Sequence, residues 1–242
     1  MTDSLVIIPT YNEIENIEAI IKAVFDLPKP FNILIVDDNS PDGTASKVAA
    51  LQEIYFDRLF LEKRPEKLGL GTAYIFGFKW ALKHNYNYVF EMDADFSHNP
   101  QDLLRLYETC ITENLDMVIG SRYVKGVNVV NWPMSRVLLS YGASKYVRFI
   151  TQMPIHDTTA GFVCYSKKLL QYIDLDKIKF VGYAFQIEMK YKAFLKKLKF
   201  KEIPVIFTDR AQGVSKMSKG IISEAIFGVI QMKINSLFKK NE

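Results

Sequence analysis

Two short runs of residues that are apolar on both faces constrain the fold more than any other feature of the chain. Residues 5–8 read Leu-Val-Ile-Ile and residues 33–36 read Ile-Leu-Ile-Val. A strand with one face in water alternates apolar and polar residues, so these runs predict strands covered on both faces. Residues 13–25 lie between the runs and carry apolar side chains at helical spacing. A strand–helix–strand order of this kind predicts a parallel sheet with helices on both sides.

The alternation of strands and helices continues to about residue 120 and then changes. We expect further strands at 58–61, 88–92, 116–119, 161–165 and 200–207, and helices at 45–54, 72–83, 101–112, 133–154, 183–196 and 220–239. Pro204 interrupts the last predicted strand, which favours an edge position in the sheet. No repeat or linker is evident, so we predict an α/β domain at 1–219, with a mainly parallel central sheet flanked by helices, and a C-terminal amphipathic helix at 220–242.

Composition excludes several classes of protein. The chain has 242 residues, of which 49% are hydrophobic, as expected for a globular protein with a sizeable core. It has no basic segment followed by an apolar stretch at the start and no run of about 18 apolar residues, so we expect neither a signal peptide nor a transmembrane helix. Cys110 and Cys164 lie far apart and outside metal-binding spacing, which favours reduced thiols in the core.

Positive charge is concentrated at the C-terminal end. Residues 190–242 carry a net charge of +8, against −4 for the rest of the chain. This asymmetry favours an anionic partner, namely phosphates, nucleic acid or a membrane surface. No nucleic-acid-binding motif is present, so we expect no nucleic-acid partner. The last predicted helix has a wide apolar face, which suits either a membrane interface or packing against the sheet.

A pair of carboxylates one residue apart follows the third apolar run. Asp93-Ala94-Asp95 comes after the predicted strand at 88–92, so both carboxylates should lie at the carboxyl edge of the sheet. Open α/β sheets bind their ligands at this edge. Carboxylate oxygens suit Mg²⁺ or Mn²⁺, and Mg²⁺ commonly bridges carboxylates to substrate phosphates. The pair therefore predicts a metal–nucleotide site.

Two other polar clusters should reach the same edge. Residues 9–13 read Pro-Thr-Tyr-Asn-Glu and residues 37–44 read Asp-Asp-Asn-Ser-Pro-Asp-Gly-Thr. Tyr11 can cover a flat base, and a carboxylate at the end of the second strand can accept hydrogen bonds from a nucleobase or ribose. Turn acids and a helix N-cap are the alternative, which we favour for Asp42. Gly69-Leu70-Gly71 fits neither the dinucleotide-binding fingerprint nor the Walker pattern, which disfavours a Rossmann dehydrogenase.

Five motifs together resemble one enzyme family. They lie at residues 9–13, 36–44, 93–98, 120–123 (Gly-Ser-Arg-Tyr) and 182–188 (Gly-Tyr-Ala-Phe-Gln-Ile-Glu). In this order they resemble the family-2 GT-A glycosyltransferases, and most of all the dolichyl and polyprenyl-phosphate mannose synthases. The resemblance covers the chain to about residue 220 and implies a GT-A fold.

The resemblance also implies roles for individual residues. Those that would bind the donor GDP-mannose are Pro9, Tyr11, Glu13, Val36, Asp38, Asp93, Ala94, Asp95, Arg122, Gln186, Glu188, Arg210 and Lys216. Asp93 and Asp95 would also hold Mg²⁺ or Mn²⁺, and Gln186 and Glu188 would line the sugar site. The catalytic set would be Asp95, Arg122, Arg136, Arg210 and Lys216.

The implied reaction transfers mannose from GDP-mannose to a polyprenyl monophosphate with inversion. A phosphate monoester is largely a dianion at neutral pH, because its second pKa is about 6, so the acceptor needs cations rather than a general base. Arg122 and Arg136 match residues that meet the acceptor phosphate. Residues 132–155 and the last helix could accommodate the prenyl tail. The enzyme would then lie on the cytoplasmic face of a membrane, bound peripherally or helped by a small membrane protein.

Several alternatives remain open from the sequence. A UDP-glucose or UDP-GlcNAc donor would leave the catalytic parts unchanged, and a binding protein with a degenerate site would also keep the fold. Arg122 could form a structural ion pair, and Glu188 could face solvent. His98 and His156 form no metal-binding trio with another histidine, and we expect both to be hydrogen-bonding loop residues.

Overall fold

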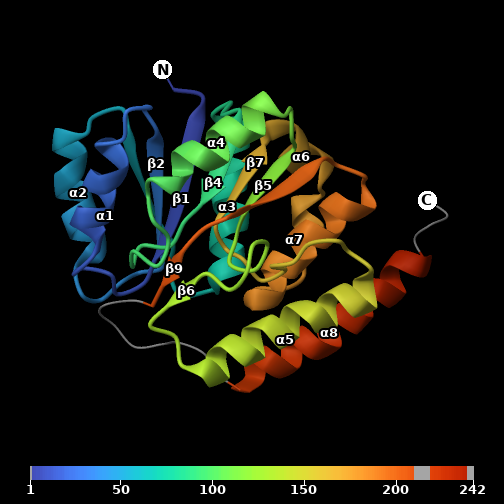
Figure 1. The fold of residues 1–242 in the computed structure, drawn as a ribbon. Helices are drawn as coiled ribbons and strands as arrows, with labels where there is room; N and C mark the ends of the chain where they lie inside the picture. Colours follow the sequence, from blue (N-terminus) through green and yellow to red (C-terminus); the bar gives the residue numbers. More distant parts are fainter. Residues whose placement is uncertain (1, 210–218, 239–242) are drawn as a thin grey trace.

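The computed structural model describes residues 2–209 and 219–238, and its centre is a twisted sheet (Figure 1). Within these residues the sheet has seven strands in the order β3-β2-β1-β4-β7-β5-β8. Their bounds are β1 Ser4–Thr10, β2 Asn32–Asp37, β3 Leu59–Lys63, β4 Tyr88–Glu91, β5 Met117–Ser121, β7 Val163–Ser166 and β8 Phe200–Pro204. Only β7 runs antiparallel to its neighbours in the sheet, so the predicted mainly parallel sheet is confirmed.

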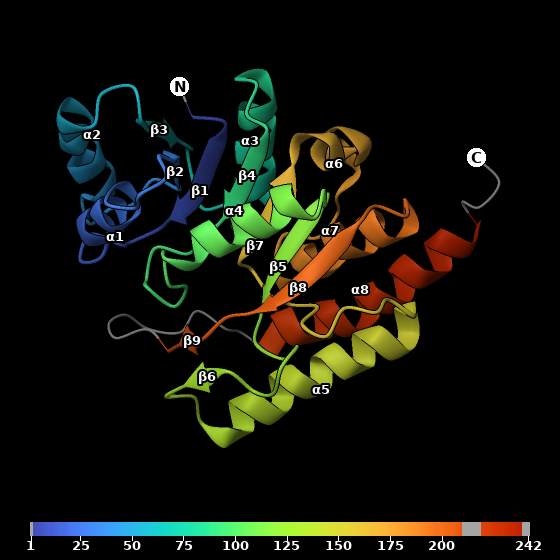
Figure 2. The ribbon, with the colours of Figure 1, turned by 45° about the horizontal axis from the view of Figure 1, so that its top comes forward.

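Helices cover both faces of this sheet, as Figure 2 shows. Their bounds are α1 Ile17–Phe25, α2 Thr44–Ile54, α3 Leu70–Lys83, α4 Asp102–Thr112, α5 Met134–Thr151, α6 Lys167–Tyr172, α7 Tyr183–Leu195 and α8 Lys219–Phe238, with a 3₁₀ turn at Leu175–Lys177. Successive residues of β1 serve different cores: Leu5 and Ile7 pack with α3 and α7, and Val6 and Ile8 pack with α1 and α4. This explains why residues 5–8 of β1 are apolar at every position.

The predicted strand at 200–207 is two strands in the structure. β8 ends at Pro204, and a second strand, β9 (Phe207–Thr208), pairs with β6 (Val129–Val130) in a separate two-stranded sheet. Proline has no N–H for the ladder, so the chain leaves the main sheet there. β8 occupies the edge of the main sheet, as predicted from Pro204.

The last helix packs against two other helices. α8 lies along α5 and also contacts α7 (Figures 1 and 2), and its Val229 and Met232 are buried in the core. Other apolar side chains of the α5 and α8 pair face outward, and we call them the α5–α8 surface: Met134, Leu138, Leu139, Phe149, Phe227, Ile230, Ile234, Leu237 and Phe238. The helix therefore combines packing with an exposed apolar face.

The structure also bears on the two cysteines and on membrane-spanning helices. Cys110 and Cys164 are both buried free thiols, as predicted. In the part of the chain that the structure describes, no helix has both the length and the hydropathy of a membrane span.

Candidate active site

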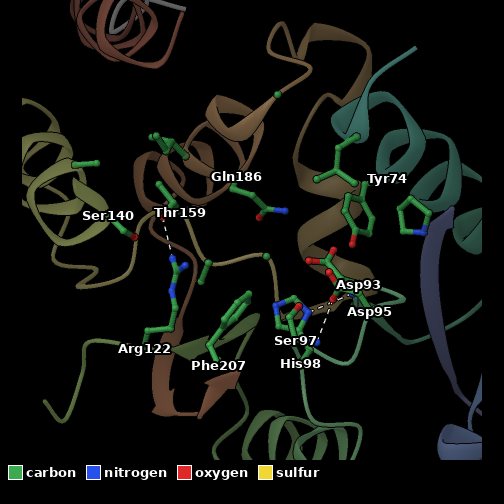
Figure 3. A pocket seen from close by; sticks show the side chains of 18 of the residues that line it. Tyr74, Asp93, Asp95, Ser97, His98, Arg122, Ser140, Thr159, Gln186 and Phe207 are labelled. Atoms are coloured by element: carbon green, nitrogen blue, oxygen red, sulfur yellow. Dashed lines mark hydrogen bonds between the residues drawn. The ribbon is translucent and has the colours of Figure 1, made fainter. Parts of the chain in front are cut away.

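A cavity of about 890 Å³ lies at the carboxyl ends of β1, β2, β4 and β5 (Figure 3). It brings together ten of the residues singled out from the sequence, namely Pro9, Tyr11, Glu13, Asp38, Asp93, Ala94, Asp95, Arg122, Arg136 and Gln186. These residues come from six separate segments of the chain. Strands that run parallel end at the same edge, which is why distant motifs meet here.

The adjacent acids after β2 each have their own partners. Asp37 accepts hydrogen bonds from the Thr10 hydroxyl (2.8 Å) and from Ser40. Asp38 forms a buried two-point ion pair with Arg64, at 2.6 and 2.8 Å. These contacts explain how two neighbouring carboxylates are tolerated at a strand end. Lys67 lies over the Tyr11 ring, 4.5 Å from its centroid, and both line the cavity.

The turn after β4 holds Asp93 and Asp95 in place. The Ser97 backbone N–H donates to Asp95 Oδ1 at 3.0 Å, and the Asp93 backbone N–H donates to His98 Nδ1 at 3.2 Å. His98 is buried and stacks on Phe162, with ring centroids 4.7 Å apart. Burial lowers the pKa of His98 to about 4, although Asp95 opposes this shift, so the ring is neutral and Nδ1 can accept. His98 is therefore a hydrogen-bonding loop residue, as predicted.

The donor groups around this turn fit a hard divalent cation. Asp93 and Asp95 lie together on one side of the cavity (Figure 3). The Ser97 hydroxyl beside them is buried and has no hydrogen-bond partner among the described residues. No cluster of three or more metal-ligating side chains occurs in the described ranges. Two carboxylates suit an ion such as Mg²⁺, which takes its remaining ligands from water and phosphate oxygens.

Arg122 follows β5 and is held by Asp157. Its Nε and Nη2 donate to the two Asp157 oxygens at 2.7 and 2.6 Å, and Nη2 also donates to Thr159 at 2.9 Å. Burial alone would raise the pKa of Asp157, but Arg122 outweighs it and holds that pKa below its ordinary value. The structural ion pair considered from the sequence is thus present, although Arg122 still lines the cavity.

Arg136 is the more accessible of the two predicted acceptor cations. It lies in the first turn of α5, pairs with Asp209 at 2.8 Å, and has its guanidinium 4.0 Å from the centroid of the Trp132 ring. The next turn of α5 adds Leu138 and Leu139 to the cavity wall. Both leucines also belong to the α5–α8 surface, so the cavity connects the carboxylates with an exposed apolar face.

Two predicted residues lie elsewhere and two lie outside the described residues. Glu188 is buried and does not line the cavity; it accepts from the backbone N–H groups of Lys179 and Phe180 and pairs with Lys192, so the alternative that it faces solvent is wrong. Val36 is part of the core. Arg210 and Lys216 fall in the segment that the structure does not describe. His156 hydrogen-bonds Glu202 at 2.8 Å, as a loop residue.

Gln186 reaches the cavity from α7 and is held by two buried charges that sequence reasoning missed. Its Nε2 donates to Glu91 at 2.7 Å, and its Oε1 accepts from Lys190 at 3.2 Å. Burial raises the pKa of Glu91 to about 8 and lowers that of Lys190 to about 8. The sequence did contain a signal for Glu91, because it directly follows the apolar residues of a buried strand. A charged side chain at such a position needs a buried partner.

Comparison with known proteins agrees with this geometry. The model of the family described as glycosyl transferase family 2 matches residues 5–173. The chain therefore belongs to that family and is a glycosyltransferase. It is 44% identical over 231 residues to the polyprenol monophosphomannose synthase of Mycolicibacterium smegmatis, covering 96% of this chain and 87% of the relative. It is 42% identical over 225 residues to the undecaprenyl-phosphate mannosyltransferase of Micrococcus luteus, covering 93% and 91%.

The solved structures confirm the GT-A fold predicted from the motifs. The structure of glucosyl-3-phosphoglycerate synthase from Mycobacterium tuberculosis, in complex with Mn²⁺, UDP and glucosyl-3-phosphoglycerate, matches with a TM-score of 0.69. Its sequence is 16% identical, and the match covers 96% of this chain and 79% of that chain.

Proposed function

We propose that this enzyme transfers mannose from GDP-mannose to a polyprenyl monophosphate, giving polyprenyl-phosphate β-mannose and GDP. The observation that carries the proposal is the continuity of the cavity, from Asp93 and Asp95, past Arg136, to the apolar wall formed by Leu138 and Leu139. A charged nucleotide site joined to an apolar face suits a lipid phosphate better than a soluble sugar acceptor. The choice of mannose as the transferred sugar and of a polyprenyl phosphate as the acceptor follows the names of the two relatives.

The donor would occupy the carboxylate end of the cavity. Asp93 and Asp95 would hold Mg²⁺ or Mn²⁺, which would supply positive charge at the leaving diphosphate. Pro9, Tyr11, Glu13 and Asp38 would surround the nucleoside, with Val36 behind them. The sequence also assigned donor contacts to Ala94, Arg122, Gln186, Glu188, Arg210 and Lys216. Of these, Ala94, Arg122 and Gln186 line the cavity and Glu188 does not, while Arg210 and Lys216 lie outside the described residues.

The acceptor would enter from α5. Arg136 is partly exposed and pairs with Asp209, so an arriving phosphate could take the place of that carboxylate. Arg122 already has both Asp157 oxygens as partners, so its role would be to shape the wall. The acceptor phosphate is ionised at neutral pH, so in-line attack with inversion requires no protein base.

The test is transfer of radiolabelled mannose from GDP-mannose to a short polyprenyl phosphate. We expect a product that extracts into organic solvent, forms with Mg²⁺ or Mn²⁺, and disappears with EDTA. Parallel reactions with UDP-glucose and UDP-GlcNAc examine the alternative donor. Product from a UDP-sugar alone would overturn the donor assignment, and the absence of product with every donor would overturn the proposed reaction.

We further propose that the α5–α8 surface rests on the cytoplasmic face of a membrane, so that the prenyl tail stays in lipid. Phe149→Asp should weaken binding to anionic vesicles about 10-fold or more, because burying one large apolar side chain contributes roughly 1.5–3 kcal/mol. Phe149 is 76% exposed, and Phe56, which follows α2 and is not part of the α5–α8 surface, is 78% exposed. Phe56→Asp is therefore the matched control and should bind like the wild type in vesicle sedimentation. Equal effects of the two substitutions would contradict this orientation.

A further inference from the structure

The cavity wall contains a buried tyrosine hydroxyl that the proposed reaction does not use. Tyr74, on α3, lines the cavity, yet its side chain is completely buried. Its hydroxyl has no hydrogen-bond partner within the described part of the chain. Buried tyrosine hydroxyls usually have a hydrogen-bond partner, because burial without one loses the hydrogen bonds to water and gains none in return. The hydroxyl therefore points to a bond that forms in another state of the protein.

The direction of this hydroxyl identifies the acceptor. Figure 3 shows it pointing toward the Asp93 carboxylate from the α3 side of the cavity. Burial, and next the charge of Asp93, raise the pKa of Tyr74 well above its usual value, so the phenol remains a proton donor at neutral pH. Asp93 has two oxygens, so it can ligate a metal ion through one of them and accept a hydrogen bond from Tyr74 through the other.

The ring of Tyr74 is held in place. It stacks on Phe185 of α7, with the ring planes 7° apart and centroids separated by 6.0 Å. Gly71, one turn earlier on α3, lets the two helices approach, since a Cβ there would lie 2.8 Å from the Phe185 ring. The hydroxyl position is thus fixed, and the short side chain of Asp93, in the turn after β4, is the partner that can adjust.

We propose that Tyr74 is a positioning residue whose hydroxyl donates a hydrogen bond to the Asp93 carboxylate when the site holds its divalent cation. The inference rests on the metal role of Asp93 in the proposed function. Hydrogen bonds to a ligating carboxylate fix its orientation, and removing such a partner typically weakens metal affinity 10–100-fold. In the metal-free protein the same hydroxyl has no partner among the described residues, so we expect it to cost stability there.

The test uses Tyr74→Phe, which deletes only the hydroxyl and keeps the stacked ring. Mn²⁺ is titrated into the full-length protein with GDP present, and the electron paramagnetic resonance signal reports free Mn²⁺. We expect Mn²⁺ to bind about 10-fold more weakly to the variant. Its thermal midpoint without metal should equal or exceed that of the wild type, because the substitution removes an unpaired buried polar group. If the hydroxyl served only packing, its removal would lower the thermal midpoint and leave Mn²⁺ affinity unchanged.

Tyr165→Phe is the matched control. Tyr165, on β7, is also completely buried, but its hydroxyl faces Glu91 and it does not line the cavity. This variant should bind Mn²⁺ like the wild type. Unchanged Mn²⁺ affinity in Tyr74→Phe would overturn the inference. A variant that binds GDP-mannose more weakly, but Mn²⁺ and GDP like the wild type, would also overturn it, because the hydroxyl would then contact the sugar. Failure of the wild type itself to bind Mn²⁺ would instead refute the metal site of the proposed function.

Discussion

Asp95→Asn should reduce mannosyl transfer at least about 10³-fold, because the loss of a metal ligand removes several kcal/mol of charge stabilisation at the leaving diphosphate. Asparagine keeps an oxygen that can accept from the Ser97 backbone N–H, so the turn should survive and only the charge is lost. The measurement is kcat/KM for GDP-mannose with saturating Mn²⁺, together with the unfolding midpoint.

The control for this variant is Asp102→Asn. Asp102 is as buried as Asp95, at 7% against 9% exposed, but it lies at the start of α4 and pairs with Arg105 outside the cavity. Its substitution should leave turnover within a few-fold of the wild type. Full activity in Asp95→Asn would remove the metal-binding role on which the mechanism depends.

Asp157→Asn should lower the free energy of unfolding by about 3–5 kcal/mol, the usual effect of leaving one member of a buried ion pair without its partner. Asp157 is fully buried and accepts three hydrogen bonds from Arg122, one of them from its backbone. Urea denaturation measures the change. Arg122→Met should cost a similar amount, and the double variant should be much less destabilised than the sum of the two singles. Additive effects would mean that the pair does not act as a unit.

The same ion pair gives a pH dependence with a defined sign. The pKa of Asp157 is lower in the folded protein than in the unfolded chain, because the attraction of Arg122 exceeds the effect of burial. Its stabilisation is therefore complete above the unfolded pKa of about 3.9 and is lost as pH falls through the folded pKa. Asp157→Asn should remove this part of the acid sensitivity, measured as the difference in unfolding free energy between pH 6 and pH 3.

The layered fold and the carboxylate edge could be predicted because their signals are local. Apolar runs such as 5–8 and 33–36 identify buried strands, and the residues directly after parallel strands must share an edge. Element ends were harder to predict: α1 begins at Ile17 instead of residue 13, because the Glu13 carbonyl accepts from Asn16 and Ile17 in a turn. The two-residue strand β6 has no recognisable pattern of its own.

Pairs that are distant in sequence account for most of what was missed. Arg122 and Asp157 are 35 residues apart, and nothing in either local sequence links them. Gln186 and Glu188 illustrate a geometric limit. They are two positions apart on α7, so their side chains point about 200° apart around the helix, and only Gln186 lines the cavity. The resemblance identified both residues as sugar contacts, whereas the helix period separates them.

The antiparallel strand β7 divides the sheet into two parts, which lead to different residues of the cavity. β1, β2 and β4 lie on one side of it and lead to Pro9, Asp38 and the turn with Asp93 and Asp95. β5 and β8 lie on the other side, leading to Arg122 and to the segment with Asp209 that holds Arg136. β8 has a single neighbouring strand in the sheet, so it can loosen without disturbing β1 or β4. Substitutions in β8 that shift Arg136 should therefore leave the carboxylate turn after β4 in place, so the two ends of the cavity can diverge independently during evolution.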